Sequence, residues 1–322
     1  MSGPPALRVG TRGSALALWQ TEHVQSLLTA ARHPTERIAI RTTGDIVQDV
    51  PLARIGSAAL FTRQIDEAML AGRIDLAVHS LKDLPTELPQ GIALAAVGER
   101  EDPSDALVGR GAIRWSEVPR DGTVATSSLR RKAQLLHARP DLRVCDVRGN
   151  VDTRLSKLDA AAGWSAILLA AAGLLRLGLG HRIGERLPAE VMLPAPGQGA
   201  LAVTARADDA RGLAAARAAV HHEPTAVAVS AERAFLRRVE GGCQVPVAAL
   251  ATLGADGTLR LHARVIALDG RRMVEGSEAG PASEVAAAER LGTALAERLL
   301  ARGAAEILAD IRRGTAPAVP EP

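Results

Sequence analysis

The chain has 322 residues, which is too long for one typical hydrophobic core and indicates two or three domains. Hydrophobic residues make up 47% of it and aromatic residues only 2%, so small aliphatic side chains must fill the cores. The net charge is +3, the two cysteines lie far apart with no zinc spacing, and no apolar stretch is long enough to span a membrane, which argues against disulfide-rich, zinc-cluster and membrane proteins.

Two further features of the composition bear on function. The N-terminal residues show no basic stretch followed by an apolar one, so we expect no secretory signal and a reduced, cytoplasmic protein. Nearly all of the positive charge is arginine. A GC-rich genome would produce that bias, but it would not place several arginines at predicted loops and helix starts. Arginine at such places suits bidentate recognition of carboxylate or phosphate.

The first part of the chain alternates strands and helices, with strands predicted at 7–9, 37–42 and 74–79 and helices at 15–31 and 60–71. The turn at 10–14 leaves free helix amides that can bind an anion, and Arg12 adds a full charge there. Ser14 fits this site and fits an ordinary helix cap equally well.

Lys82 and Asp83 directly follow the third predicted strand, and Pro85 ends regular structure after them. Ligands of open α/β sheets bind at the carboxyl ends of strands. A carboxylate at this place can stabilise positive charge that develops during a reaction. A solvated surface ion pair is the alternative interpretation.

Charged residues and proline at 99–103 indicate a crossing into a second α/β unit. We predict strands there at 123–125, 143–147 and 166–170 and helices at 129–138 and 151–158. The strand ends are followed by Arg130, Arg131, Arg148, Arg154 and Arg176. Cations at a helix start oppose the helix dipole, so Arg130 and Arg131 favour an anion pocket. Cys145 lies in the middle of a predicted strand, and we expect it to be a core residue.

A second proline-glycine crossing at 192–199 leads back to a strand at 200–205 and helices at 209–220 and 226–236. Three strands with tight Asp-Gly turns follow, at 247–253, 258–267 and 272–277, and then a helix at 285–302 and a tail after Gly314 that we expect to be disordered. We therefore predict a first α/β lobe at 1–99 and 200–219, a second α/β lobe at 100–199, and a C-terminal α+β domain with a three-stranded antiparallel sheet at 220–322.

Cys243 stands in the loop Val239–Pro246, at the entrance of the C-terminal domain. Gly241 and Gly242 end the preceding helix, and Pro246 keeps the cysteine out of a strand ladder. A thiol in such a loop is accessible, as reactive cysteines are. A spare surface cysteine is the alternative.

The chain resembles the porphobilinogen deaminase family, also called hydroxymethylbilane synthases, over nearly its whole length. The segments that show the resemblance are Thr11–Gln20, Asp75–Pro85, Thr126–Arg131, Arg148–Asn150, Pro196–Gly199 and Glu240–Pro246. It implies two lobes similar to periplasmic binding proteins around a cleft, and a third, smaller domain.

The resemblance also implies site residues. Cys243 would hold a dipyrromethane cofactor through a thioether, and Asp83 would act on charge at the pyrrole nitrogens. The residues implied to bind the carboxylates of cofactor and substrate are Arg12, Ser14, Lys82, Thr126, Ser127, Ser128, Arg130, Arg131, Arg148, Arg154, Arg176, Gln198 and Gly199. The implied reaction is head-to-tail condensation of four porphobilinogen molecules with loss of ammonia, followed by hydrolytic release of hydroxymethylbilane. No nucleic-acid or membrane partner is implied, and we expect a monomer.

Three positions depart from the family pattern: Ala58 stands where a lysine is common, Ala125 replaces a usual glycine, and Gln64 a usual glutamate. Two other functions fit parts of the sequence. A non-catalytic, two-lobed anion-binding protein would explain the lobes and the arginines but not Cys243. An acyl-transfer enzyme with a Cys243 nucleophile lacks an evident histidine partner. A nucleic-acid-binding role lacks aromatic stacking platforms.

Overall fold

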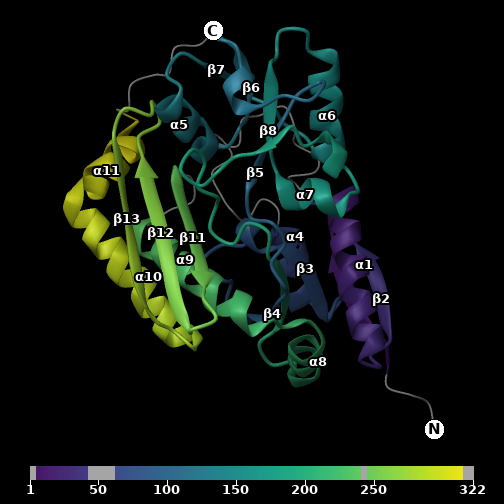
Figure 1. Ribbon diagram of the computed structural model, residues 1–322. Coiled ribbons are helices and arrows are strands. Elements are labelled where there is room, and N and C mark those ends of the chain that lie inside the picture. Colours follow the sequence, from purple (N-terminus) through teal and green to yellow (C-terminus); the bar gives the residue numbers. More distant parts are fainter. Residues whose placement is uncertain (1–4, 43–61, 241–244, 315–322) are drawn as a thin grey trace.

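The computed structural model describes residues 5–42, 62–240 and 245–314. They form three sheets, each with its own helices (Figure 1). Among these residues, no helix is both long and apolar enough to cross a membrane. Cys243, Gln244, the loop around Ala58 and the tail after Gly314 lie outside the described residues, so the predictions made for them stay predictions.

The first lobe contains a five-stranded sheet of order β2-β1-β3-β10-β4. Its strands are β1 (Leu7–Thr11), β2 (Thr35–Ala39), β3 (Leu76–Ser80), β4 (Ile92–Val97) and β10 (Leu201–Arg206). Its helices are α1 (Ala15–Ala30), α4 (Arg63–Leu70), α8 (Ala210–Val220) and the short 3-10 turn Leu81–Asp83. The helix start at Ala15 is set by Ser14, whose side chain accepts a hydrogen bond from the Ala17 amide.

The second lobe contains a five-stranded sheet of order β7-β6-β8-β5-β9. Its strands are β5 (Asp105–Val108), β6 (Thr123–Ala125), β7 (Arg143–Cys145), β8 (Ala166–Ala170) and β9 (Glu185–Arg186). Its helices are α5 (Leu129–Ala138), α6 (Val151–Ala160), α7 (Ala171–Arg176) and the 3-10 turns Trp115–Glu117 and Gly180–Arg182.

Both sheets are mixed, and the reason lies in the two crossings between the lobes. We call residues 98–104 the first crossing and residues 187–200 the second crossing. β5, which follows the first crossing, runs antiparallel to β8, and β10, which follows the second, runs antiparallel to β3. The neighbouring pairs β1–β3 and β6–β8 are parallel. Each lobe therefore receives one strand from the opposite direction when the chain enters it from the other lobe.

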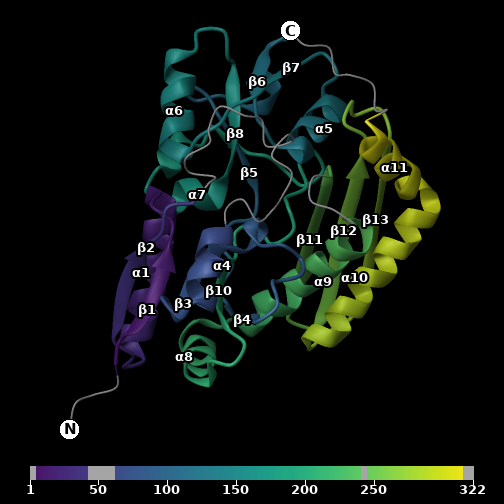
Figure 2. The same ribbon diagram turned by 180° about the vertical axis from the view of Figure 1, so that it is seen from behind.

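The C-terminal domain has a three-stranded antiparallel sheet of β11 (Val247–Leu253), β12 (Thr258–Ile266) and β13 (Met273–Pro281). Its helices are α9 (Glu223–Glu240), α10 (Val285–Leu299) and α11 (Ala305–Arg313), and the π-helical turn Leu300–Ala304 connects the last two. The helices pack against the sheet, with α10 and α11 at the outer side of the molecule in both views (Figure 2) and α9 facing inward, where its Glu232 pairs with Arg100 of the first crossing at 2.6 Å. Val227, Phe235, Leu261 and Leu295 belong to the core between them. Two α/β lobes and a small α+β domain confirm the predicted fold class.

Most predicted elements are present, with local differences. β4, β5 and β9 were not predicted, and the helix expected at 285–302 ends at Leu299. Gly303 has φ 108°, which a helix cannot contain, and this glycine separates α10 from α11. β13 is longer than predicted, because it pairs with β12 as far as Pro281 although Gly276 and Gly280 hide the strand pattern in the sequence.

Candidate functional site: a cationic cleft between the two lobes

A cavity of about 270 Å³ lies between the two lobes, and side chains from both reach it. From the first lobe, Arg12 and Ser14 follow β1, and Lys82 and Asp83 follow β3. From the second lobe come Arg131 near the start of α5, Arg148 after β7, and Arg154 on α6. The carboxyl ends of the parallel strands meet here, which brings together seven of the residues predicted from the sequence.

Lys82 and Asp83 do not form an isolated surface pair. The Lys82 ammonium group donates a hydrogen bond of 3.2 Å to Oε1 of Gln198, in the second crossing. Burial among protein atoms lowers the pKa of Lys82 to about 8, with Asp83 acting against the shift, although water still reaches the side chain. The Lys82 ammonium group therefore loses its proton more readily than that of an ordinary lysine.

Arg154 belongs to a group of like charges on the second-lobe side of the cleft. Burial, together with the neighbouring Arg131 and Arg148, lowers its pKa to about 10. Its Nε donates a hydrogen bond of 2.8 Å to the carbonyl of Gly149, which orients the guanidinium group. A bound carboxylate would relieve the repulsion among these cations.

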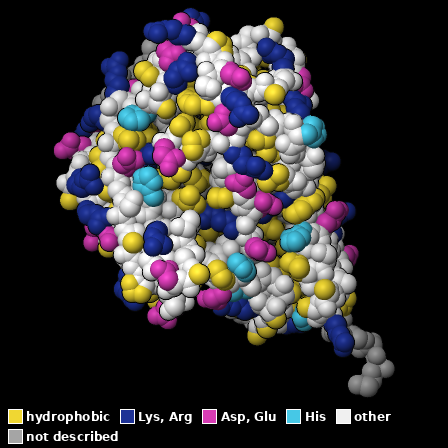
Figure 3. All heavy atoms as spheres, in the orientation of Figure 1, with side chains coloured by type: hydrophobic (Ala, Val, Ile, Leu, Met, Phe, Trp, Pro, Cys, Tyr) yellow, Lys and Arg dark blue, Asp and Glu magenta, His cyan; other side chains and the backbone are white. Residues whose placement is uncertain are grey.

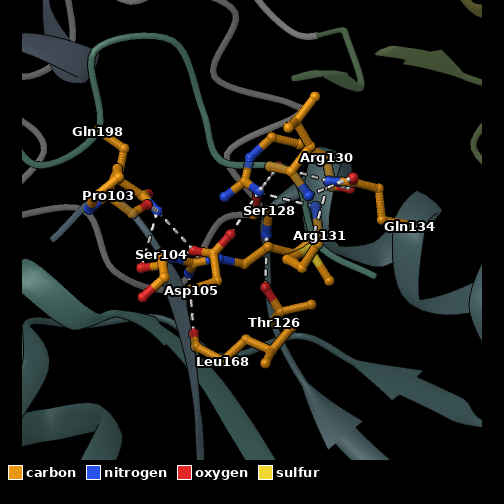
Figure 4. A network of polar contacts seen from close by, with 12 residues as sticks. Pro103, Ser104, Asp105, Thr126, Ser128, Arg130, Arg131, Gln134, Leu168 and Gln198 are labelled. Atoms are coloured by element: carbon orange, nitrogen blue, oxygen red, sulfur yellow. Dashed lines mark hydrogen bonds and ion pairs between the residues drawn. The ribbon is translucent and has the colours of Figure 1, made fainter. Parts of the chain in front are cut away.

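Arg130 and Arg131 contact an internal anion. The Asp105 carboxylate, fully buried at the start of β5, accepts a hydrogen bond of 2.6 Å from each arginine (Figure 4). Burial alone would raise the pKa of Asp105, but the two guanidinium groups outweigh it and hold this pKa well below its usual range. Arg130 lies behind the cleft, with a second bond to the Leu193 carbonyl, whereas Arg131 also lines the cavity.

Gln198 extends this network to the second crossing. Its buried side-chain amide donates to the Asp105 carboxylate at 3.0 Å and to the Pro103 carbonyl at 2.7 Å, while its Oε1 accepts from Lys82. Lys82, Gln198, Asp105 and Arg131 thus form one connected set of contacts that joins the first lobe to the second (Figure 4 shows the part around Asp105).

The hydroxyl residues of the second lobe are engaged in backbone contacts. Ser128 caps α5 by accepting from the Arg131 amide, and Thr126 accepts from the Ser128 amide. Ser127 donates to the Val147 carbonyl and accepts from the Val147 amide. These bonds fix the turns from which the cleft arginines project.

Several predicted residues lie away from the cavity or outside the described chain. Gly199 lies in the second crossing, and Arg176, at the end of α7, donates a hydrogen bond to its carbonyl and lies beside Trp19 of α1. Cys145 is half-buried at the end of β7, not deep in a core. Sequence reasoning missed Asp105, although a carboxylate at the head of the buried run Asp105–Val108 is a signal of a paired charge. It also missed Ser80, Asn150 and Asp152, which line the cavity.

The face seen in Figure 3 gives no support to a nucleic-acid-binding role. On this face, the Lys and Arg side chains are interspersed with Asp and Glu. The fold and the site together define a two-lobed α/β protein whose interlobe cleft suits a ligand with several carboxylates, beside the Asp83 carboxylate.

Comparison with known proteins identifies the family. The family model "Porphobilinogen deaminase, dipyromethane cofactor binding domain" matches residues 7–214. The model "Porphobilinogen deaminase, C-terminal domain" matches residues 226–301. A porphobilinogen deaminase of Desulforudis audaxviator is 53% identical over 309 residues, 95% of this chain and 98% of that protein. One of Pelobacter propionicus is 50% identical over 311 residues, 96% and 98% of the two chains. The chain belongs to the porphobilinogen deaminase family.

Among solved structures, the methionine-binding protein MetQ is similar with a TM-score of 0.42 and 12% identity over 65% of this chain and 87% of that one. Family membership makes the chain a transferase of tetrapyrrole biosynthesis, which builds hydroxymethylbilane from porphobilinogen and uses a dipyrromethane cofactor. It gives no support to the alternative of a non-catalytic anion-binding protein.

Proposed function

We propose that the interlobe cleft is where this chain condenses four porphobilinogen molecules, with Asp83 as the catalytic carboxylate and Cys243 as the attachment point of the cofactor. The observation that supports this most strongly is the convergence of Asp83 with five cationic side chains in one cavity: Arg12, Lys82, Arg131, Arg148 and Arg154.

The cleft suits a dipyrromethane group. Such a group has several carboxylates on a flat apolar skeleton, and the cavity offers cationic donors from both lobes together with the apolar side chains of Leu16, Leu169 and Leu177. Arg131, Arg148 and Arg154 would bind its carboxylates from the second lobe. When bound, the dipyrromethane supplies the nucleophilic carbon to which the first substrate is joined and anchors the product until hydrolysis.

Asp83 acts on the substrate. Loss of ammonia from the aminomethyl group of porphobilinogen leaves a cationic azafulvene, whose positive charge is shared with the pyrrole nitrogen. The Asp83 carboxylate stabilises this cation, and a fixed carboxylate does so without reorganisation. Arg12 and Lys82, beside it in the first lobe, hold the substrate carboxylates so that the pyrrole nitrogen faces Asp83.

Cys243 is the better of the two cysteines for cofactor attachment. Burial raises the pKa of the Cys145 thiol, and the adjacent Asp146 raises it further, so Cys145 is a poor nucleophile. The C-terminal domain that contains Cys243 is joined to the loop after Asp83, because Arg233 of α9 donates a hydrogen bond of 2.7 Å to the Pro85 carbonyl.

The remaining features of the proposal concern organisation. We assign the first lobe to 1–99 and 200–219, the second to 100–199 and the C-terminal domain to 220–322, in agreement with the three sheets. We propose that the active form is a monomer, as expected from the family resemblance. The location is the cytoplasm, where a reactive thiol stays reduced.

The test is the intact mass of the purified protein followed by peptide mapping. We expect a mass above that of the sequence by one dipyrromethane unit, located on the peptide that contains Cys243. Cys243→Ser should lack both the added mass and activity, whereas Cys145→Ser, the matched control, should keep both. A free Cys243 thiol in active enzyme would refute the attachment.

A further inference from the structure

The C-terminal domain shares a hydrophobic core with the first lobe. Ala226 and Val229 of α9 are buried in one apolar cluster with residues of the first lobe and the second crossing. Those residues are Leu81, Leu84, Val97, Ala200 and Ala202. On the same helix, Arg233 donates a hydrogen bond of 2.7 Å to the Pro85 carbonyl. Separating these two bodies would expose the cluster to water, at a cost that grows with the apolar area exposed.

The second lobe meets the C-terminal domain through polar groups. Arg264 of β12 is only 4% exposed and donates a hydrogen bond of 3.0 Å to the side chain of Gln134 on α5. Near the end of α5, Nδ1 of His137 lies 2.8 Å from the carbonyl of Gly270, in the turn between β12 and β13. In both views α5 lies next to this end of the C-terminal sheet (Figures 1 and 2). The apolar clusters of the second lobe contain, among the described residues, none from the C-terminal domain, so this contact can part without exposing those clusters.

Both sides of the polar contact keep partners when it parts. The Nε of Arg264 donates at 2.8 Å to Glu275 on β13, within its own domain. Gln134 exchanges two hydrogen bonds with the backbone of Leu193, of 2.9 and 3.0 Å. Exposure to water would also restore hydration to a guanidinium group that is now buried. Parting therefore leaves neither side chain buried and unpaired.

The first crossing passes from the C-terminal domain to the second lobe within a few residues. Arg100 binds Glu232 of α9 with two hydrogen bonds, of 2.6 and 3.2 Å. Two residues later, Asp102 pairs with Arg186 of the second lobe at 2.7 Å. The chain can therefore bend at residue 101, between an end held by α9 and an end held by β9.

The second crossing shows the same division. Leu193 is bound to the second lobe through Gln134, whereas the next residue, Pro194, accepts a hydrogen bond of 3.1 Å from the Ala249 amide of β11. Further along, the Gly197 amide donates at 2.6 Å to Glu232, whose side chain is 0% exposed. Glu232 thus holds the first-lobe ends of both crossings against the C-terminal domain.

We propose that the first lobe and the C-terminal domain form one rigid frame, and that the cleft widens when the second lobe rotates away from both. The contacts of Arg264 and His137 then part, while the apolar cluster of α9 stays closed. The contact between Gln198 and Asp105 lies next to the two hinge points, where a rotation displaces atoms least.

The need for widening rests on the proposed function. The cavity of about 270 Å³ is smaller than the roughly 300–1,000 Å³ that hold one drug-sized ligand, and the product adds four pyrroles to the cofactor. Asp83 follows β3, and Cys243 lies between α9 and β11 in sequence, so both belong to the frame. Arg131, Arg148 and Arg154 belong to the moving lobe. The cleft therefore gains room by moving its carboxylate-binding side.

The test measures distances between pairs of spin labels on the three bodies. Labels are placed at exposed positions by Thr29→Cys on α1, Ser156→Cys on α6 and Ala286→Cys on α10, two at a time, in a Cys145→Ser background. Each distance is measured by pulsed electron paramagnetic resonance on the purified enzyme and again after limiting porphobilinogen. A mass spectrum of every sample gives the number of pyrroles bound.

We expect the distance from Thr29 to Ala286 to stay constant and both distances from Ser156 to increase as pyrroles are added. A constant distance from Ser156 to Ala286 with a changing distance from Thr29 to Ala286 would overturn the proposal. Three constant distances in samples with bound intermediates would overturn it as well. Mass spectra without bound intermediates would instead count against the proposed function, and the next comparison still decides the inference.

Arg264→Leu tests the parting contact without substrate. Because a hydrogen bond to a charged group is lost, the fraction of molecules with a longer distance from Ser156 to Ala286 should rise roughly tenfold, with the distance from Thr29 to Ala286 unchanged. Arg260→Leu is the matched control, since Arg260 is an exposed arginine of the same strand, and it should match the wild type. If Arg264→Leu does not fold, Arg264→Lys replaces it, because lysine keeps the charge but loses the planar fork. A wild-type distribution in the folded variant would refute the rigid frame, whatever the roles of Asp83 and Cys243.

Discussion

Asp105→Asn tests the buried charge cluster behind the cleft. In the wild type the Asp105 carboxylate accepts hydrogen bonds from Arg130 at 2.6 Å, from Arg131 at 2.6 and 2.9 Å, and from Gln198 at 3.0 Å. The side chains of both arginines are only 7% exposed and that of Asp105 is 0% exposed. Asparagine has nearly the same shape, but it removes the charge and points an N–H group at a guanidinium group.

The expected cost is large, because two buried cations lose their shared counter-ion. Removing one partner of a buried ion pair typically lowers the free energy of unfolding by about 3–5 kcal/mol. The matched control is Asp141→Asn, whose partner Arg139 is 25% exposed. Partly exposed pairs of this kind contribute little to stability, because water screens them. Urea unfolding, together with hydrogen exchange of α5 and β5, would measure the difference between the two variants.

The pH dependence gives a second, independent check. The pKa of Asp105 is lowered in the folded protein, so its contribution is complete above the unfolded value, 3.8, and is lost as the pH falls toward the folded value. The gap in stability between the wild type and Asp105→Asn should therefore be constant from pH 7 to about 5 and should narrow below about 4. A cost no larger than that of Asp141→Asn, or a gap that does not narrow in acid, would refute the assigned charge state.

Three further predictions concern the cleft and the crossings. Asp83→Asn should keep the fold and the cofactor but lose on the order of 10²–10³ in turnover, measured as hydroxymethylbilane formed, and near-normal turnover would remove Asp83 from catalysis. Since the pKa of Lys82 is about 8, its attraction for carboxylates is present below that pH and lost above it, so the KM for porphobilinogen should rise between pH 7 and 9. Lys82→Arg should flatten this rise, and identical profiles would contradict the charge change. Gly199→Ala should lower the free energy of unfolding by roughly 1–3 kcal/mol, because Gly199 has a φ of +88°. Gly163→Ala is the control and should have little effect, since nothing lies within 4 Å of the added Cβ. Equal effects of the two substitutions would contradict the need for glycine at position 199.

Much of the fold could be predicted because local signals and tertiary structure agree. β6 (Thr123–Ala125), α5 (Leu129–Ala138) and β8 (Ala166–Ala170) have the predicted bounds. Their ends coincide with turn residues and a serine cap, which are readable in sequence. β5 (Asp105–Val108) was missed because it begins with an acidic residue in a charged, proline-containing stretch, and only the arginines that reach it from α5 make the buried carboxylate tolerable.

The sequence predicted the presence of the cleft but not the contacts of each arginine in it. Arginines after strand ends indicated an anion site, and the strand ends do meet at one cavity. The sequence could not show which arginine has an internal partner. Arg130 and Arg131 are adjacent in the chain, yet successive helix residues point about 100° apart, so one lies behind the cleft and the other at its wall.

Asp105 also determines how much positive charge the second lobe presents to a ligand. Arg130 and Arg131 with one shared carboxylate leave a single net charge, and Arg131 presents it at the cavity wall. Arg131 is close enough to Arg154 to lower the pKa of Arg154. Without Asp105, the charges of both arginines of α5 would repel the other cations of the cleft and lower the stability of the folded protein. Because Asp105 is the counter-ion, α5 can have two arginines at its start without destabilising the protein when no ligand is bound. The remaining positive charge still attracts carboxylates to the cleft.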